Sequence, residues 1–165
     1  MFQIGDRVMY GVHGVCNIVD REQSVVDHRN VEYLVLEPVG QKSGRFLVPV
    51  ANPKAMAKVK RILTVQELET LLTSEDIRKD SWIRDEGTRK QTYRELISSA
   101  DRIRLMAMVH SLYCHREEQL AAGKKCHLCD ENFLKDAEKL LVSEISIVLE
   151  MEPEQARAYL REHLK

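Results

Sequence analysis

Residues 5–19 read Gly5-Asp6-Arg7-Val8-Met9-Tyr10-Gly11-Val12-His13-Gly14-Val15-Cys16-Asn17-Ile18-Val19, and two similar runs follow at 31–36 (Val-Glu-Tyr-Leu-Val-Leu) and 45–50 (Arg-Phe-Leu-Val-Pro-Val). The runs are short, rich in β-branched and aromatic residues, and interrupted by glycine, asparagine and charged turns. This composition is typical of a small, strongly curved antiparallel barrel. The sequence therefore predicts an N-terminal β module.

Turns and edges within this module are indicated by its polar and proline residues. The polar stretch 20–30 predicts a connection, with at most a short strand at 24–26. The run 45–50 predicts a strand that ends at Pro49, and because proline cannot donate to a ladder, this strand suits a sheet edge. Such an edge could pair with a strand of another protein, or the rest of the chain could cover it.

After about residue 64 the pattern changes to helix. Thr64-Val65-Gln66-Glu67 fits a capping box and predicts a helix that starts there. Residues 76–87 are charged and broken, and further helices are predicted to begin near Thr88, at Asp101, at Asp130 and at Pro153. We therefore expect an α+β chain with a β domain at 1–62 and an all-α domain at 63–165.

Composition limits the classes of protein that remain. No stretch of the 165 residues approaches the roughly 18 to 20 apolar residues of a membrane span, and the first residues lack the pattern of a signal peptide. We expect a cytoplasmic protein with no membrane contact. A Gly-rich phosphate loop, a nucleophile elbow and an HExxH motif are all missing, so we expect neither an enzyme nor a cofactor.

Charge is distributed unevenly along the chain. The formal net charge is -1, but residues 1–64 hold nine Lys/Arg and six Asp/Glu (+3), and residues 65–165 hold sixteen and twenty (-4). The segment 78–104 is again +3, with eight basic and five acidic residues. Contact with nucleic acid would therefore have to be local, and a solvated helix face is the competing interpretation.

Cysteines and histidines gather at 114–129, as Cys114-His115 and Cys126-His127-Leu128-Cys129. Thiols and imidazoles are zinc ligands, but the adjacent pair Cys114-His115 would point in different directions from a helix and fits a closed tetrahedral site poorly. We expect reduced thiols and no metal. A zinc- or redox-responsive interaction protein that uses Cys114, Cys126 and Cys129 is the alternative.

Trp82 forms a small apolar island with Ile83 among charged residues. An indole beside guanidinium groups can stack on bases or wedge between them. From residue types alone, the favoured role is that Trp82 and Ile83 anchor this loop onto the helical core.

The order and spacing of these motifs resemble the CarD/CdnL transcription regulators, whose N-terminal module is shared with the polymerase-binding module of the transcription-repair coupling factor. In the β half the resemblance is carried by Gly5-Asp6-x-Val8-x-Tyr10, His13-Gly14-Val15, Glu32-Tyr33-Leu34-Val35-Leu36 and Val48-Pro49. In the helical half it is carried by Ser81-Trp82-x-Arg84, Ser98-x-x-Asp101 and Asp130-Glu131-x-Phe133-Leu134-x-x-Ala137-x-x-Leu140-Leu141-x-x-Glu144.

This resemblance implies a Tudor-like barrel that adds its edge strand to the β subunit of bacterial RNA polymerase. It also implies a helical domain in which Trp82 wedges into promoter DNA at the edge of the unwound bubble, supported by Arg84. The chain departs from the family pattern at Leu47, where relatives often have a basic residue, so polymerase contact would rest on Arg45 or on backbone pairing. It departs again at 85–87, an acidic interruption within the basic-aromatic cluster.

We therefore predict a monomeric, nucleoid-associated transcription regulator that stabilises the open promoter complex. The predicted polymerase-binding residues are Arg45, Phe46, Leu47 and Val48, and the predicted DNA-binding residues are Trp82, Arg84, Arg89, Lys90 and Arg94. A polymerase-binding adaptor that does not touch DNA remains a second alternative.

Overall fold

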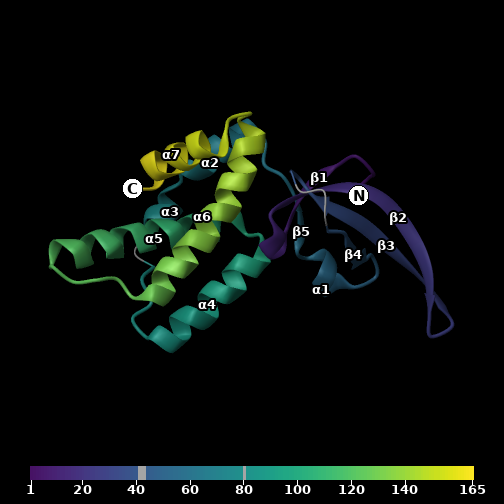
Figure 1. Cartoon of the computed structure of the whole chain (residues 1–165), viewed down its shortest axis with the longest axis horizontal. Coiled ribbons are helices and arrows are strands. Elements are labelled where there is room, and N and C mark those ends of the chain that lie inside the picture. The colour runs from purple at the N-terminus through teal and green to yellow at the C-terminus, as the bar shows by residue number, and fades with distance from the viewer. Residues whose placement is uncertain (41–43, 80) are drawn as a thin grey trace. The chain divides into compact units, whose positions relative to one another are not determined.

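A computed structural model describes residues 1–40, 44–79 and 81–165. The chain forms two compact units, Met1–Ile62 and Leu63–Lys165, which we call the N-terminal unit and the helical unit. Strands dominate the first and helices the second (Figure 1). The predicted α+β fold class is confirmed.

Within residues 1–40 and 44–62, which the structure describes, five strands form one sheet: β1 (Arg7–Tyr10), β2 (Val15–Val26), β3 (Arg29–Pro38), β4 (Phe46–Pro49) and β5 (Val59–Arg61). All neighbours are antiparallel and the order is β4-β3-β2-β1-β5, so β4 is an edge strand, as predicted. Two short helical turns, η1 (Gly11–His13) and α1 (Pro53–Met56), join strands. The core of the sheet consists of Val8, Cys16, Ile18, Leu34, Leu36, Val48 and Val59.

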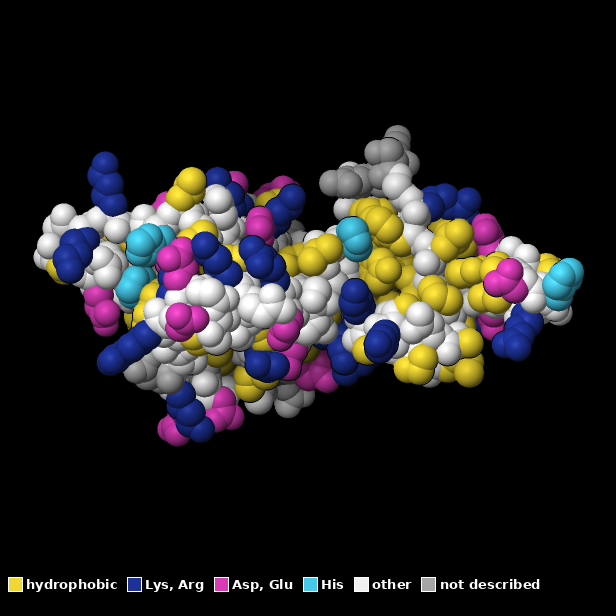
Figure 2. Space-filling view, turned by 90° about the horizontal axis from the view of Figure 1, so that it is seen from below, with side chains coloured by type: hydrophobic (Ala, Val, Ile, Leu, Met, Phe, Trp, Pro, Cys, Tyr) yellow, Lys and Arg dark blue, Asp and Glu magenta, His cyan; other side chains and the backbone are white. Residues whose placement is uncertain are grey.

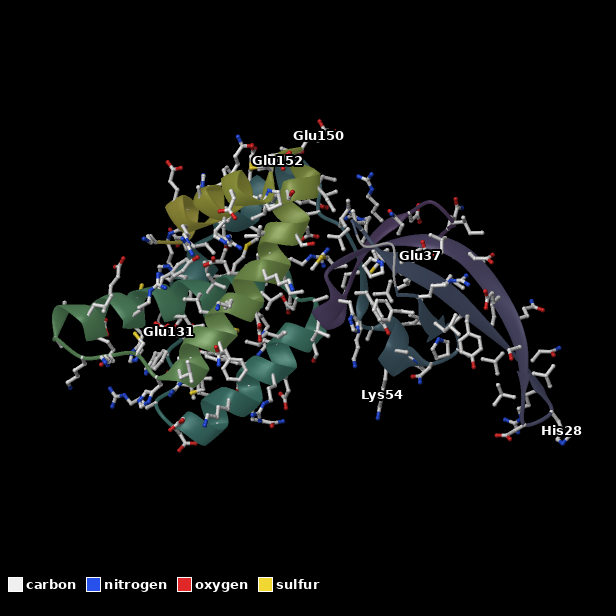
Figure 3. The ribbon with its side chains drawn as sticks, viewed as in Figure 1. His28, Glu37, Lys54, Glu131, Glu150 and Glu152 are labelled. Carbon is white, nitrogen blue, oxygen red and sulfur yellow. The ribbon has the colours of Figure 1, made fainter. Side chains whose placement is uncertain are left out.

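The predicted connection at 20–30 is wrong. β2 and β3 pair continuously from Asp20 opposite Val35 to Val26 opposite Arg29, and they form a long curved hairpin with His28 at its tip (Figures 1 and 3). Most of the outer ribbon is exposed on both faces, so its sequence lacks the apolar alternation by which a half-buried strand is identified. Asp27 and His28 form the two-residue turn with φ values of 50° and 62°, although neither is the glycine that usually marks such turns.

The helical unit contains α2 (Val65–Leu72), α3 (Glu75–Arg78), α4 (Glu86–Ser99), α5 (Arg102–Ala121), α6 (Leu128–Val148) and α7 (Pro153–Leu164). The predicted capping box is present: the Thr64 hydroxyl accepts from the Glu67 N–H at 3.1 Å, and the Glu67 carboxylate accepts from the Thr64 N–H at 2.8 Å. Asp101 caps α5 and Pro153 begins α7, as predicted. None of the helices within the described ranges is long and apolar enough for a transmembrane segment.

The predicted starts of two helices are wrong. α4 begins at Glu86, because Asp85 caps it by accepting from the Thr88 N–H at 2.8 Å. α6 begins at Leu128, and Asp130 lies in its first turn instead of at its N-cap. The carboxylate of Asp130 is used by a distant arginine, described below.

Buried charges in the helical unit are paired across helices. Arg102 of α5 binds Glu144 of α6 at 3.1 Å, with side-chain exposures of 9% and 2%. Glu138 of α6 accepts from the Tyr113 hydroxyl at 2.6 Å and from Arg161 at 3.0 Å. Because a buried charge without a partner is costly, these pairs fix which helix faces meet.

Candidate functional site

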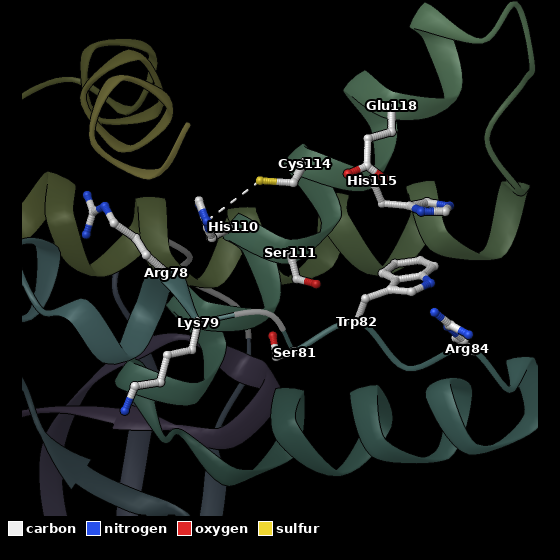
Figure 4. A pocket seen from close by; sticks show the side chains of 10 residues that line it. All are labelled: Arg78, Lys79, Ser81, Trp82, Arg84, His110, Ser111, Cys114, His115 and Glu118. Atoms are coloured by element: carbon white, nitrogen blue, oxygen red, sulfur yellow. Dashed lines mark hydrogen bonds between the residues drawn. The ribbon is translucent and has the colours of Figure 1, made fainter.

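Trp82 lies in the segment between α3 and α4, and we call residues 81–85 the Trp82 loop. The indole is partly exposed. It stacks on the imidazole of His115 in α5, with ring centroids 3.7 Å apart and an interplanar angle of 12° (Figure 4). The guanidinium of Arg89 lies over the indole, 4.6 Å from the ring centroid. The ring is therefore held in one orientation by groups from α4 and α5.

Arg89 anchors this loop to the helical core. It is 3% exposed, and its Nε and Nη2 donate to the two carboxylate oxygens of Asp130 at 2.8 and 3.0 Å. Its Nη1 donates to the carbonyls of Ile83 and Arg84 at 3.0 and 3.4 Å. Since the guanidinium is occupied within the protein, we reassign Arg89 from the predicted DNA contact to support of the Trp82 loop.

Helical spacing separates the remaining predicted cations from Arg89. Arg89 and Tyr93 are four residues apart and point inward, where Tyr93 packs edge-on against Phe133 at 5.6 Å. Lys90 and Arg94 point outward, and Lys90 pairs with Glu86 at 2.9 Å. Three predicted cations, Arg84, Lys90 and Arg94, therefore have solvent-accessible side chains in or after the Trp82 loop.

A hollow of about 520 Å³ opens beside Trp82. Among its lining residues are Arg78, Trp82, Arg84, His110, Cys114 and His115 (Figure 4). Elsewhere on the face of the helical unit that Figure 2 shows, basic and acidic side chains are interspersed. The site thus combines a partly exposed aromatic ring with local positive charge.

The His115 imidazole that stacks on the indole is partly buried. Burial lowers the pKa of His115 below its usual 6.5; Asp130 opposes that shift, and Arg89 adds to it. The imidazole is therefore mainly neutral near pH 7. The sequence interpretation placed His115 among candidate metal ligands and missed this role, because the partner ring comes from a different segment of the chain.

The four cysteines have separate surroundings. Cys16 is buried in the sheet, Cys129 Sγ donates to Glu86 at 3.6 Å, and Cys114 Sγ lies 3.7 Å from His110 Nε2. Residues 1–40, 44–79 and 81–165 contain no group of three or more His, Cys, Asp or Glu side chains that could hold a metal ion. The structure therefore offers no ligand set for the zinc alternative within that part of the chain.

The β4 edge is the second candidate site. The Leu47 side chain is 52% exposed, whereas Val48 is fully buried and Phe46 stacks on His13 at 4.1 Å. Arg45, just before the strand, is exposed and pairs with Glu22 at 3.2 Å. Of the four predicted polymerase-binding residues, Arg45 and Leu47 thus present side chains to solvent, whereas the side chain of Val48 is buried.

The register of β4 shows which peptide groups are available at this edge. Val50 N–H donates to the Glu32 carbonyl of β3 at 3.0 Å, and Val48 lies opposite Leu34. Because peptide groups alternate in direction along an antiparallel strand, those of Phe46 and Val48 face β3 and that of Leu47 faces outward. Pro49 has no N–H to offer.

Comparisons with known proteins agree on both units. The family model described as the CarD-like/TRCF RID domain matches residues 2–60, and the model described as the CarD C-terminal domain matches residues 66–161. No curated protein matches the chain. The RID domain is Tudor-like, which agrees with the antiparallel five-stranded sheet. The chain therefore belongs to the CarD family, whose members are transcription regulators that interact with RNA polymerase.

Proposed function

We propose that this protein stabilises the open promoter complex by binding the β subunit of RNA polymerase with its N-terminal unit and promoter DNA with its helical unit. The observation that carries this proposal is the way in which neighbouring residues hold the Trp82 side chain. The indole is partly exposed, stacked on His115, and held through Arg89 and Asp130 to α6. A residue that only filled the core would not need exposure, and a residue that acts as a wedge needs such rigid support.

The chemistry of the Trp82 loop suits unstacked DNA. An aromatic side chain can insert at a base step and offset part of the unstacking cost, which is on the order of a few kcal/mol. Arg84, Lys90 and Arg94 can contact phosphates, which position the protein without reading sequence. We therefore expect low sequence specificity, with preference for steps that unstack easily.

The proposed polymerase contact is backbone pairing at β4. An outward-facing peptide at Leu47 and the exposed Leu47 side chain allow a strand of the β subunit to extend the sheet. This contact would hold the helical unit close to the promoter. Tethering raises the effective concentration of a weak DNA contact, which a helical half with an excess of four acidic residues requires.

The proposed mechanism is differential binding. A factor that binds the open complex more tightly than the closed one shifts that equilibrium only by the difference, typically about 1–3 kcal/mol for a coupling of this kind. The excess of acidic residues after residue 64 favours one competing function, an adaptor that binds polymerase without touching DNA.

One experiment distinguishes these two functions. The full chain is added at saturating concentration to complexes of bacterial RNA polymerase and promoter DNA, and the lifetime of the open complex is measured after a competitor is added. Our proposal predicts a longer lifetime, by about fivefold to 150-fold for a coupling of that size. Binding of polymerase with an unchanged lifetime would contradict it and support the adaptor.

A further inference from the structure

The four thiols of this chain differ in what surrounds each sulfur. Burial raises the pKa of Cys16 to about 11. The pKa of Cys126 is also raised, by burial first and then by the charge of Glu131. The Cys129 thiol donates to the Glu86 carboxylate at 3.6 Å. Burial thus disfavours the thiolate, the reactive form of cysteine, at Cys16 and Cys126, and the thiol of Cys129 is already engaged with a carboxylate.

Cys114 has a different neighbour. It lies one helical turn after His110 on α5, and its Sγ is 3.7 Å from His110 Nε2. The other ring nitrogen, Nδ1, contacts the backbone carbonyl of Leu164 at the end of α7. A carbonyl only accepts, so in the neutral ring Nδ1 carries the proton and Nε2 is left to accept from the thiol. This is the arrangement of an activated nucleophile: a thiol, a base, and a third group that orients the base.

Among the described residues that line the hollow beside Cys114, three are basic (Arg78, Lys79 and Arg84) and one is acidic (Glu118). The Arg78 guanidinium donates to the carbonyls of Leu72, Ser74 and His163, at 3.0, 3.2 and 2.8 Å, so it is fixed in place by groups that do not neutralise it. Lys79 is itself paired with Asp76 at 2.6 Å. Cations near a thiol favour its thiolate and attract an anionic reagent.

We propose that Cys114 is a modification site that forms a mixed disulfide with anionic low-molecular-weight disulfides. The thiol proton passes to His110 Nε2, and the Cys114 thiolate attacks one sulfur of the reagent's disulfide. A new S–S bond forms to Cys114 as the reagent's S–S bond breaks, and the second half leaves as a thiolate that can take up the proton. Cys114 is exposed on the surface of the hollow, as this attack requires. The modification does not depend on the proposed DNA contact, and it is tested without DNA.

The test uses the full, reduced chain with glutathione disulfide, which is anionic, and with cystamine, which is cationic. Peptide mass mapping over time gives the rate at each of the four cysteines. We expect Cys114 to react at least tenfold faster than Cys126 and Cys129. The ratio of its rates with glutathione disulfide and cystamine should also exceed the same ratio in the urea-unfolded chain, which corrects for the intrinsic reactivity of the two reagents.

The variant His110→Gln tests the base. It should slow modification of Cys114 several-fold and leave the rates at Cys126 and Cys129 unchanged, which also shows that the helical unit is still folded. Equal rates at Cys114 and Cys126 in the parent protein would overturn the proposal. So would an unchanged Cys114 rate in His110→Gln, or a charge ratio no higher than that of the unfolded chain.

Discussion

The two candidate sites of this protein are built in opposite ways. At the β4 edge, the group available for binding is part of the backbone. The peptide of Leu47 faces outward and the side chain of Val48 is buried. At the Trp82 loop, the group available for binding is the Trp82 side chain, which is held in place by His115, Arg89 and Asp130. An edge strand needs only the register of its own sheet, whereas an exposed aromatic ring needs support from distant segments.

This difference predicts where each site is vulnerable. Substitutions on the β4 edge should affect binding only when they change backbone donors. At the Trp82 loop, substitutions should act through exposed residues that contact DNA and also through buried supporting residues that never touch it. The four predictions that follow test this contrast, from the largest expected effect to the smallest.

Arg89→Ala should destabilise the helical unit by about 3–5 kcal/mol, because it leaves the Asp130 carboxylate buried without its partner. The Arg89–Asp130 pair has 4% exposure on each side. Urea unfolding followed by the fluorescence of the chain's one tryptophan reports the stability of this unit. The matched control is Lys90→Ala, which removes the next cation along the helix from an exposed pair and should cost less than about 1 kcal/mol. Equal stability of the two variants would show that the Trp82 loop is not anchored through Arg89.

Leu47→Pro should weaken binding to the polymerase β subunit about tenfold or more, because a lost backbone hydrogen bond that leaves its partner unsatisfied costs about 1–3 kcal/mol. The substitution removes an outward N–H and leaves the donors that face β3 in place. Leu47→Ala is the control, since it shortens the side chain and keeps the N–H. If Leu47→Ala weakens binding as much as Leu47→Pro, the edge is recognised by its side chain and backbone pairing is the wrong explanation.

Arg84→Ala should shorten the open-complex lifetime a few-fold. The slope of log affinity against log salt concentration should fall by about one, the change expected for one lost phosphate contact. Lys139→Ala is the charge-matched control, because Lys139 lines a different hollow of the helical unit. The assignment of Arg84 fails if both variants lower the salt slope equally.

His115 should make the stability of the helical unit depend on pH. Its folded pKa lies below the unfolded value of 6.5, so its contribution is complete above pH 6.5 and is lost as the pH falls through the folded value. His115→Phe keeps a flat ring against Trp82 and removes the titration. The loss of unfolding free energy between about pH 7.5 and about pH 5.5 should therefore be smaller in His115→Phe than in the parent protein. An equal loss of unfolding free energy in both proteins would mean that protonation of His115 does not affect the stability of the helical unit.

Local signals in the sequence predicted local structure well. The capping box at Thr64, the Asp101 cap and the start of α7 at Pro153 are each set by residues within one helical turn, and all three are present. The β2–β3 hairpin was missed because its outer part is exposed on both faces and its turn is Asp27-His28. Pairing between strands, which specifies that ribbon, leaves little trace in a single sequence.

The support of the Trp82 loop could not be predicted in the same way. Arg89 and Asp130 are 41 positions apart, and an arginine that follows Trp82 is the residue type expected of a phosphate contact. One signal was available: Arg89 and Tyr93 share one helical face, and Lys90 and Arg94 share a different one, so α4 could have been divided into a buried and an exposed side.

The central claim, that the supported indole of Trp82 contacts unstacked promoter DNA, is tested most directly by the open-complex lifetime with Trp82→Ala. Base-aromatic contacts are worth about 1–3 kcal/mol, so the lifetime conferred by the parent protein should fall about tenfold or more. Binding of Trp82→Ala to polymerase should be unchanged, because β4 is intact. A folded Trp82→Ala protein that binds polymerase and supports the parent lifetime would contradict the claim and leave Trp82 as a packing residue.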